Sequence, residues 1–592
     1  MDNKLIKDRI IDNLIALYGK EKGSLTWSEL EKSLETYQQE NPQDLERSSL
    51  DTLENLDALL ITYADQIQSP GQTHIQTLAN FIQGNLKGLT STVHLLPFFP
   101  YSSDDGFSVI DYKAVDPEVG AWEDLDRFGN CCQLMFDAVV NHISSQSNWF
   151  KGFLEDQDPY TEYFLTTNLE ADLSQVVRPR ETPLLSEIKT PSGIKHVWTT
   201  FSPDQIDLNY KNPLVLLEII DVLLFYVEKG ARIIRLDAIA YLWKEIGTSC
   251  IHLPQTHQVI KLIRAVLDYV APEVIIISET NVPHQENISY FGNQLPGSKG
   301  KYPLGDEAQM VYQFPLGPLV LHTFRTENAT ALTNWASSIE TPFSSAVFLN
   351  FIASHDGIGV RPAEGLLSEE EIQGLVDQTL DHGGQVSYKT NPDGSKSVYE
   401  LNITLYDALN HPLNEPQDQG VKRFLASQAI MLSLSGVPGI YIHSLFGSRN
   451  SHTSVIESGR VRSINREKFQ LSEIKRELKD GSSRSSKVFS AYTHLLDIRK
   501  AQLAFKPLNP QQILDLDCQV FGVCRNTIDD SESILCLVNV TNLPVELSLD
   551  NQEIDLSFPG VDLLTGEKYT YPEIILDPYQ ILWIKNLEDK SK

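Results

Sequence analysis

Short apolar runs alternate with helical stretches along most of this 592-residue chain, and this alternation constrains its fold more than any other feature. Runs that are apolar throughout are typical of parallel strands covered on both faces. The alternation continues from about residue 56 to about residue 510, which favours an α/β fold of the (β/α)8 TIM barrel type over a doubly wound sheet. The strand candidates are residues 59–63, 91–96, 133–140, 231–237, 274–279, 346–351 and 437–442.

The regions around this barrel have different patterns. Residues 1–55 show helical periodicity and predict an N-terminal helical segment, whereas residues 511–592 carry short alternating runs that predict a C-terminal antiparallel β-domain. Two insertions, at about residues 143–205 and 357–420, interrupt the barrel region of 56–510, and the second contains the turn signal Asn391-Pro392-Asp393-Gly394. We expect these inserted B-type domains to shape a substrate pocket.

Composition excludes several classes of function. The formal net charge of −31 at pH 7 repels nucleic acid and anionic membranes, so we expect neither as a partner. The N-terminus is charged and lacks the apolar core of a signal peptide, and the apolar runs are shorter than a bilayer span. The six cysteines show no metal-ligand spacing, and no cofactor motif is visible. The sequence therefore predicts a cytoplasmic monomer or homodimer with free thiols and without metal or cofactor.

Polar clusters directly follow four of the predicted strands, at residues 137–142, 235–237, 278–280 and 354–356. A barrel brings the carboxyl ends of its strands together, so we expect the four clusters to share one pocket. Each cluster alone would be interpreted as a capped strand end or a solvated loop carboxylate. All four in order, spaced by strand-plus-helix lengths, predict an active site.

Three carboxylates in these clusters, Asp237, Glu279 and Asp356, suit the cleavage of a glycosidic bond. One can attack the anomeric carbon, one can protonate the leaving oxygen and later deprotonate the acceptor, and the third can support the oxocarbenium-like transition state. Arg235 lies two residues before Asp237 on the same strand face, where it can hold that carboxylate ionised.

These motifs resemble the ordered signatures of the α-amylase superfamily, and residues 205–210 resemble an additional signature of that superfamily. More narrowly, the chain resembles the sucrose phosphorylase branch at residues 93–100, 104–107, 235–244, 355–359 and 459–468. The resemblance implies that Asp237 is the nucleophile, Glu279 the acid/base and Asp356 the transition-state stabiliser. It also implies that the glucosyl unit is held by Asp104, His142, Arg235 and His355, although a histidine considered singly could be a satisfied core residue.

The same resemblance implies a phosphate site, because members of this branch pass glucose to inorganic phosphate and release α-glucose 1-phosphate. The densest basic stretch of this acidic chain follows the last predicted strand and contains Arg449, Arg460, Arg462, Arg466 and Lys468. We expect Arg460 and Arg462, with Arg361 on a neighbouring loop, to bind phosphate or the acceptor. The alternative is a solvated basic loop paired with Glu457 and Glu467. Asn141 resembles a calcium-binding position of true amylases, but the branch generally works without metal.

The acceptor side favours glucosylglycerate as the α-glucoside. Residues 359–365, residues 391–394 with 399–403, and the N-terminal helical segment depart from sucrose-specific members and look more like the glucosylglycerate phosphorylase group. Arg361 can bind an acceptor carboxylate through two hydrogen bonds, although it can equally serve phosphate. Sucrose, glucosylglycerol and phosphorylated sucrose remain alternative substrates, and a hydrolytic α-glucosidase would use the same carboxylates. A noncatalytic binding module would have lost them.

Overall fold

The computed structural model describes residues 3–41, 48–180, 182–295, 303–390, 395–414, 416–549, 559–570 and 572–586. At its centre eight parallel strands close into a barrel, and their order around the ring follows their order in the chain. The (β/α)8 prediction is therefore confirmed. The strands are β1 Leu59–Thr62, β3 Thr92–Leu95, β4 Gln133–Ala138, β9 Ala231–Leu236, β10 Ile275–Ser278, β11 Met310–Gln313, β12 Val347–Asn350 and β16 Val437–Tyr441.

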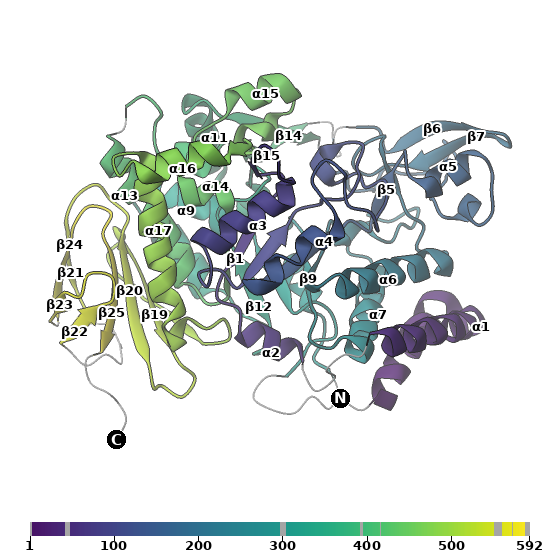
Figure 1. The fold of residues 1–592 in the computed structure, drawn as a ribbon, viewed down its shortest axis with the longest axis horizontal. Coiled ribbons are helices and arrows are strands. Elements are labelled where there is room, and N and C mark those ends of the chain that lie inside the picture. Colours follow the sequence, from purple (N-terminus) through teal and green to yellow (C-terminus); the bar gives the residue numbers. More distant parts are fainter. Residues whose placement is uncertain are drawn as a thin grey trace.

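One barrel strand, β11, was not among the predicted runs. It has four residues, and polar Gln309 and Gln313 flank its apolar part, so no continuous apolar run marks it in the sequence. Helices surround the barrel and cover the outer faces of its strands (Figure 1). They include α3 His74–Asn85, α6 Pro213–Glu228, α7 Pro254–Val270, α9 Leu316–Thr326, α13 Gln417–Ser433 and α17 Arg484–Lys500. No helix in the described ranges is both long and apolar enough to cross a bilayer.

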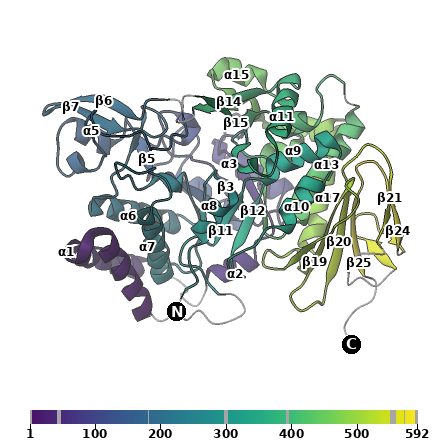
Figure 2. The ribbon, with the colours of Figure 1, turned by 180° about the vertical axis from the view of Figure 1, so that it is seen from behind.

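The helical N-terminal region lies against the outside of the barrel. Helix α1 Asn3–Glu40 is broken at Gly19, whose φ of 79° lies outside the helical region, and α2 Ser49–Glu54 follows it. Figures 1 and 2 show α1 beside α7, at the opposite end of the molecule from the C-terminal strands. Arg9 Nη1 donates to Asp268 Oδ2 of α7 at 2.9 Å, which attaches α1 to the barrel.

Both insertions lie at the same end of the barrel (Figure 1). The first contains the antiparallel pair β5 His142–Ser144 and β8 Gln205–Asp207, the helix α5 Asn148–Leu154 and the hairpin of β6 Leu185–Thr190 and β7 Gly193–Trp198. The second forms a three-stranded sheet of β13 Ile358–Gly359, β15 Lys396–Asn402 and β14 Gln385–Thr390, with helix α11 Glu369–Asp381. The predicted turn at residues 391–394 lies outside the described residues.

The C-terminal region forms the predicted antiparallel β-domain. Its main sheet has the order β18-β19-β20-β25-β22-β23, and β21 Val545–Ser548 pairs with β24 Glu573–Leu576. Buried Arg525 of β19 Val520–Asn526 donates to the carbonyl oxygens of Ser433 and Leu434 at 3.1 and 2.8 Å, at the end of α13. The other strands are β18 Gln511–Ile513, β20 Ser533–Asn539, β22 Gly560–Asp562, β23 Lys568–Tyr569 and β25 Ile581–Asn586.

Candidate active site

The carboxyl ends of the barrel strands open into a pocket of about 860 Å³, counted to its open mouth. Arg235 of β9 and the residues after β9, β10 and β12 meet here, because parallel strands end on one face of the barrel, and fully buried Asp137 of β4 lies next to Arg235. Eight of the ten predicted site residues line the pocket: Asp104, His142, Arg235, Asp237, Glu279, His355, Asp356 and Arg462.

Buried Arg235 connects the carboxylates of the pocket. Its Nη1 donates to Asp237 Oδ1 at 2.7 Å and also to Asp137, while its Nη2 lies 3.9 Å from Glu279 Oε2. The strand register explains the first contacts, since Arg235 is the partner of Asp137 in the β4–β9 ladder and Asp237 follows two residues later. The rings of Phe107 and Tyr312 lie 5.7 and 5.6 Å from the guanidinium carbon. Arg235 therefore stays charged and fixed in position.

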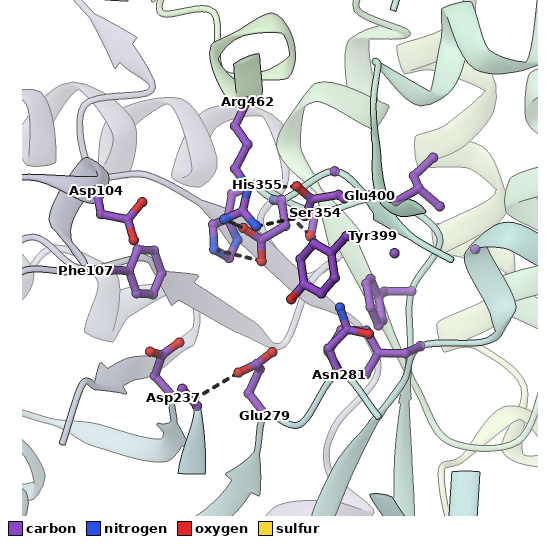
Figure 3. Close-up of a pocket in the computed structure, with 18 of the residues that line it drawn as sticks. Asp104, Phe107, Asp237, Glu279, Asn281, Ser354, His355, Tyr399, Glu400 and Arg462 are labelled. Atoms are coloured by element: carbon purple, nitrogen blue, oxygen red, sulfur yellow. Dashed lines mark hydrogen bonds and ion pairs between the residues drawn. The ribbon is translucent and has the colours of Figure 1, made fainter. Parts of the chain in front are cut away.

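Asp237 and Glu279 lie side by side on one side of the pocket (Figure 3). Burial raises the pKa of Asp237, and the Arg235 charge opposes this shift. The pKa of Glu279 is raised to about 7. Burial is the largest cause, the charges of Asp237 and Asp356 act in the same direction, and the charge of Arg235 opposes the shift. Glu279 Oε2 accepts a hydrogen bond from the backbone of Ala238 at 3.0 Å, and Ala238 has a left-handed backbone with φ of 47°. A carboxyl group with a pKa near 7 can both donate and accept a proton at neutral pH.

Asp356 is held ionised by a different set of cations. Arg462 Nη1 donates to Asp356 Oδ1 at 2.5 Å, and Arg466 Nη2 lies 3.5 Å from the same oxygen. Burial acts against the charged form, but the charges of Arg462 and Arg466 hold the pKa of Asp356 well below its usual range. In Figure 3 Arg462 enters the pocket from the side opposite Asp237 and Glu279. One carboxyl group in the pocket thus exchanges protons near pH 7, whereas Asp356 remains charged.

The predicted sugar-binding residues lie around these carboxylates. Burial lowers the pKa of His355 to about 3, so its imidazole is neutral, and its ring stacks on Phe107 at 5.2 Å between centroids. His142 Nε2 lies 2.8 Å from the carbonyl oxygen of Phe107. Asp104 Oδ2 accepts a hydrogen bond from Gln205 Nε2 at 3.2 Å. Neutral imidazole and carboxylate groups offer the donors and acceptors that sugar hydroxyls need.

The arginines predicted to bind anions lie in three different environments. Arg460 pairs with Asp105 at 2.5 Å and does not line the pocket. Arg462 lines the pocket but also pairs with Glu400, through Nη2 and Oε1 at 2.9 Å. Arg361 begins a short 3-10 helix, Arg361–Ala363, outside the pocket wall.

Four further residues that line the pocket were not among the predicted site residues, namely Arg180, Asn281, Tyr399 and Glu400. The last two lie in the segment that was associated with the acceptor from the sequence. Arg180 comes from an irregular part of the first insertion, where no strand or helix pattern indicated its direction. Its positive charge helps to lower the pKa of Asp104, against the effect of burial. Among the described residues no carboxylate forms an ion pair with Arg180, so its charge is available to a bound anion.

A lysine ammonium group lies beside Asn141, the residue that resembles a calcium-binding position of amylases. Buried Lys244 donates to Asn141 Oδ1 at 2.8 Å and pairs with Asp207 Oδ2 at 2.7 Å. Its ammonium group therefore links the loop after β4, the end of the first insertion and the loop after β9. In the described part of the chain no group of three or more histidine, cysteine or acidic side chains could hold a metal ion.

A (β/α)8 barrel with an arginine-linked pair of carboxylates at its carboxyl face has the architecture of glycoside-cleaving enzymes. Comparison with known proteins agrees with this class. The α-amylase catalytic-domain family matches residues 85–360. A glucosylglycerate phosphorylase from Allomeiothermus silvanus is 51% identical over 529 residues, which cover 89% of this chain and 91% of that protein. One from Spirochaeta thermophila is 45% identical over 598 residues and covers 99% of both chains.

Among solved structures, the sucrose 6F-phosphate phosphorylase from Thermoanaerobacter thermosaccharolyticum shares the fold, with a TM-score of 0.70 and 24% identity over 87% of this chain and 98% of that one. The chain belongs to the glycoside phosphorylases of the α-amylase family.

Replacing Lys244 tests the importance of the buried cation. The change Lys244→Met leaves the buried Asp207 carboxylate without its charged partner, which we expect to cost about 3–5 kcal/mol of folding free energy. Thermal denaturation should show a clearly lower midpoint. Lys211→Met is the matched control, since Lys211 forms an exposed pair with Glu245 and its loss should cost less than about 0.5 kcal/mol. Equal midpoints for the two variants would contradict the assigned role of Lys244.

Proposed function

We propose that this chain is a glucosylglycerate phosphorylase, which transfers glucose from 2-O-α-glucosyl-D-glycerate to inorganic phosphate and releases α-glucose 1-phosphate. The observation that carries the proposal is one pocket that combines the carboxylates Asp237 and Glu279 with Arg180, a cation without a carboxylate partner among the described residues. A hydrolase needs no such cation. The activity named for the two relatives at 51% and 45% identity supports glucosylglycerate as the substrate.

In the first step Asp237 attacks the anomeric carbon while the bond from that carbon to the glycerate oxygen breaks. Glu279 gives its proton to the departing oxygen, and a glucosyl ester forms on Asp237. The 2.7 Å contact from Arg235 keeps Asp237 ionised and directed into the pocket. Asp356 stays charged and stabilises the oxocarbenium-like transition state.

In the second step phosphate takes the place of glycerate. Glu279, now a carboxylate, accepts the proton of the phosphate hydroxyl, and the phosphate oxygen attacks the anomeric carbon as the ester bond to Asp237 breaks. Two displacements on opposite faces restore the α configuration. Asp104, His142, Arg235 and His355 hold the glucosyl unit through both steps.

Glycerate and phosphate both carry negative charge, and both approach the same face of the glucosyl unit. Arg180 is therefore the first candidate to bind both anions, with Arg361 as an outer cation. Arg460 and Arg462 already have carboxylate partners, so we assign them a supporting role in the charge of the pocket. Sucrose phosphorolysis and hydrolysis are the alternative activities. The free cysteines fit a cytoplasmic enzyme.

The proposal is tested with purified protein given either glucosylglycerate or sucrose, with and without phosphate. We expect glucose 1-phosphate from glucosylglycerate only when phosphate is present, with a kcat/KM at least about tenfold above that for sucrose, since a lost carboxylate–arginine contact costs about 1.4 kcal/mol or more. Arg180→Gln should raise the KM for phosphate by a similar factor. Free glucose formed without phosphate dependence would overturn the assignment, and preference for sucrose would refute the choice of glycerate.

The pKa of Glu279 predicts the pH dependence. Glu279 must be protonated to act as the acid, and its raised pKa of about 7 keeps it protonated below neutrality. The kcat/KM for glucosylglycerate should therefore fall as pH rises through about 7. This constant covers only the steps up to the glucosyl-enzyme, so the titration of phosphate does not enter it. With α-glucosyl fluoride, whose leaving group needs no proton, the fall should disappear; its persistence would contradict the role of Glu279.

A further inference from the structure

Glu400 is a buried carboxylate in the wall of the pocket, with 2% of its surface exposed. It lies on β15 of the second insertion, where it is the partner of Gly359 in the antiparallel pair with β13. The chain approaches it closely at Gly357, because a Cβ there would lie 2.5 Å from Glu400 Cγ. The backbone beside Asp356 is thus shaped to admit this carboxylate.

Glu400 holds Arg462 through two hydrogen bonds. Arg462 Nε donates to Oε2 at 3.0 Å and Nη2 donates to Oε1 at 2.9 Å, a geometry that fixes the plane of the guanidinium group. The remaining nitrogen, Nη1, donates to Asp356 Oδ1 at 2.5 Å. Figure 3 shows Glu400, Arg462 and His355 grouped at one side of the pocket. Arg462 is therefore fixed between two carboxylates, one on strand β15 and the other in the loop after β12.

We propose that Glu400 is a positioning residue for catalysis and a determinant of anion affinity. By fixing Arg462, it orients Asp356 toward the glucosyl unit. Its negative charge also offsets the charge of Arg462 and leaves Arg180 as the cation that an entering anion meets. The second part rests on the proposed function, since it takes phosphate as the anion; the first part holds for any α-glucoside.

A purely structural role would have different consequences. Glu400 could serve only to attach the second insertion to the loop that carries Arg462. Its loss would then lower thermal stability and reduce the amount of active protein, without altering the KM for phosphate.

The test compares Glu400→Gln with the wild-type protein. Glutamine keeps the size of the side chain but loses the charge and the second strong acceptor, so Arg462 and Asp356 lose their fixed orientation. We expect kcat for glucosyl transfer to fall about 10- to 100-fold. The KM for phosphate should fall about three- to tenfold, because one negative charge leaves the pocket wall. The thermal midpoint should fall less than in Lys244→Met, because Arg462 keeps Asp356 as a charged partner.

Glu364→Gln is the matched control. Glu364 belongs to the same insertion, is exposed and lies 3.7 Å from Lys389, outside the pocket wall, so this change should leave both constants unaltered. A wild-type kcat in Glu400→Gln would overturn the positioning role. A lowered kcat with a lowered midpoint and an unchanged KM for phosphate would reduce Glu400 to a structural contact.

Hydrolysis of α-glucosyl fluoride separates this proposal from the assignment of substrates. That reaction needs neither glycerate nor phosphate, yet it depends on Asp356. A wild-type protein that hydrolyses the fluoride but ignores phosphate would refute the proposed function, whereas the predicted fall in kcat of Glu400→Gln could still be measured. Equal rates of fluoride hydrolysis in both proteins would refute the positioning role alone.

Discussion

The active site depends on one buried guanidinium group, that of Arg235. It donates to Asp137 and Asp237 and lies 3.9 Å from Glu279, so it determines how three largely buried carboxylates are arranged. Without this charge, burial alone would drive Asp237 toward its neutral form. The barrel register places Arg235 opposite Asp137, which means that closure of the barrel assembles the charge cluster. Arg235 thus connects the closure of the barrel to the geometry of the proposed catalytic carboxylates.

The arrangement of the other charged side chains in the pocket depends on how its cations pair with its carboxylates. The chain has a net charge of −31, and under the proposed function its pocket would hold several carboxylates and still admit an anion. Arg462 and Arg466 form ion pairs with Asp356, and Arg460 forms one with Asp105. Arg180 has no carboxylate partner in the described ranges. Lys244 supplies a further fixed cation beside Asn141 and Asp207. Under the proposed function, anion recognition would depend on which cations are already paired.

The sequence predicted the features that strand pattern and chain order determine. The barrel and the convergence of residues near Asp137, Asp237, Glu279 and Asp356 follow from parallel strands that end on one face. Strand β11 was not predicted, because polar residues flank its short apolar part. The places of Arg180 and Glu400 in the pocket were not predicted for another reason. Both come from insertions, where no periodicity indicates which side chains face the barrel, and the segment of Glu400 was marked only by its resemblance. The partners of Arg460 and Arg462 lie far away in the chain, so a basic stretch could not show which of its charges were already neutralised.

The most direct test of the account is to find where glucose is attached during turnover. The variant Glu279→Gln, mixed with α-glucosyl fluoride, should accumulate the glucosyl-enzyme, because fluoride leaves without a proton while removal of the ester needs the missing base. Peptide mass spectrometry should then find one glucosyl residue on the peptide that contains Asp237. Unmodified protein that has consumed the fluoride, or glucose attached to another carboxylate such as Asp356, would contradict the account.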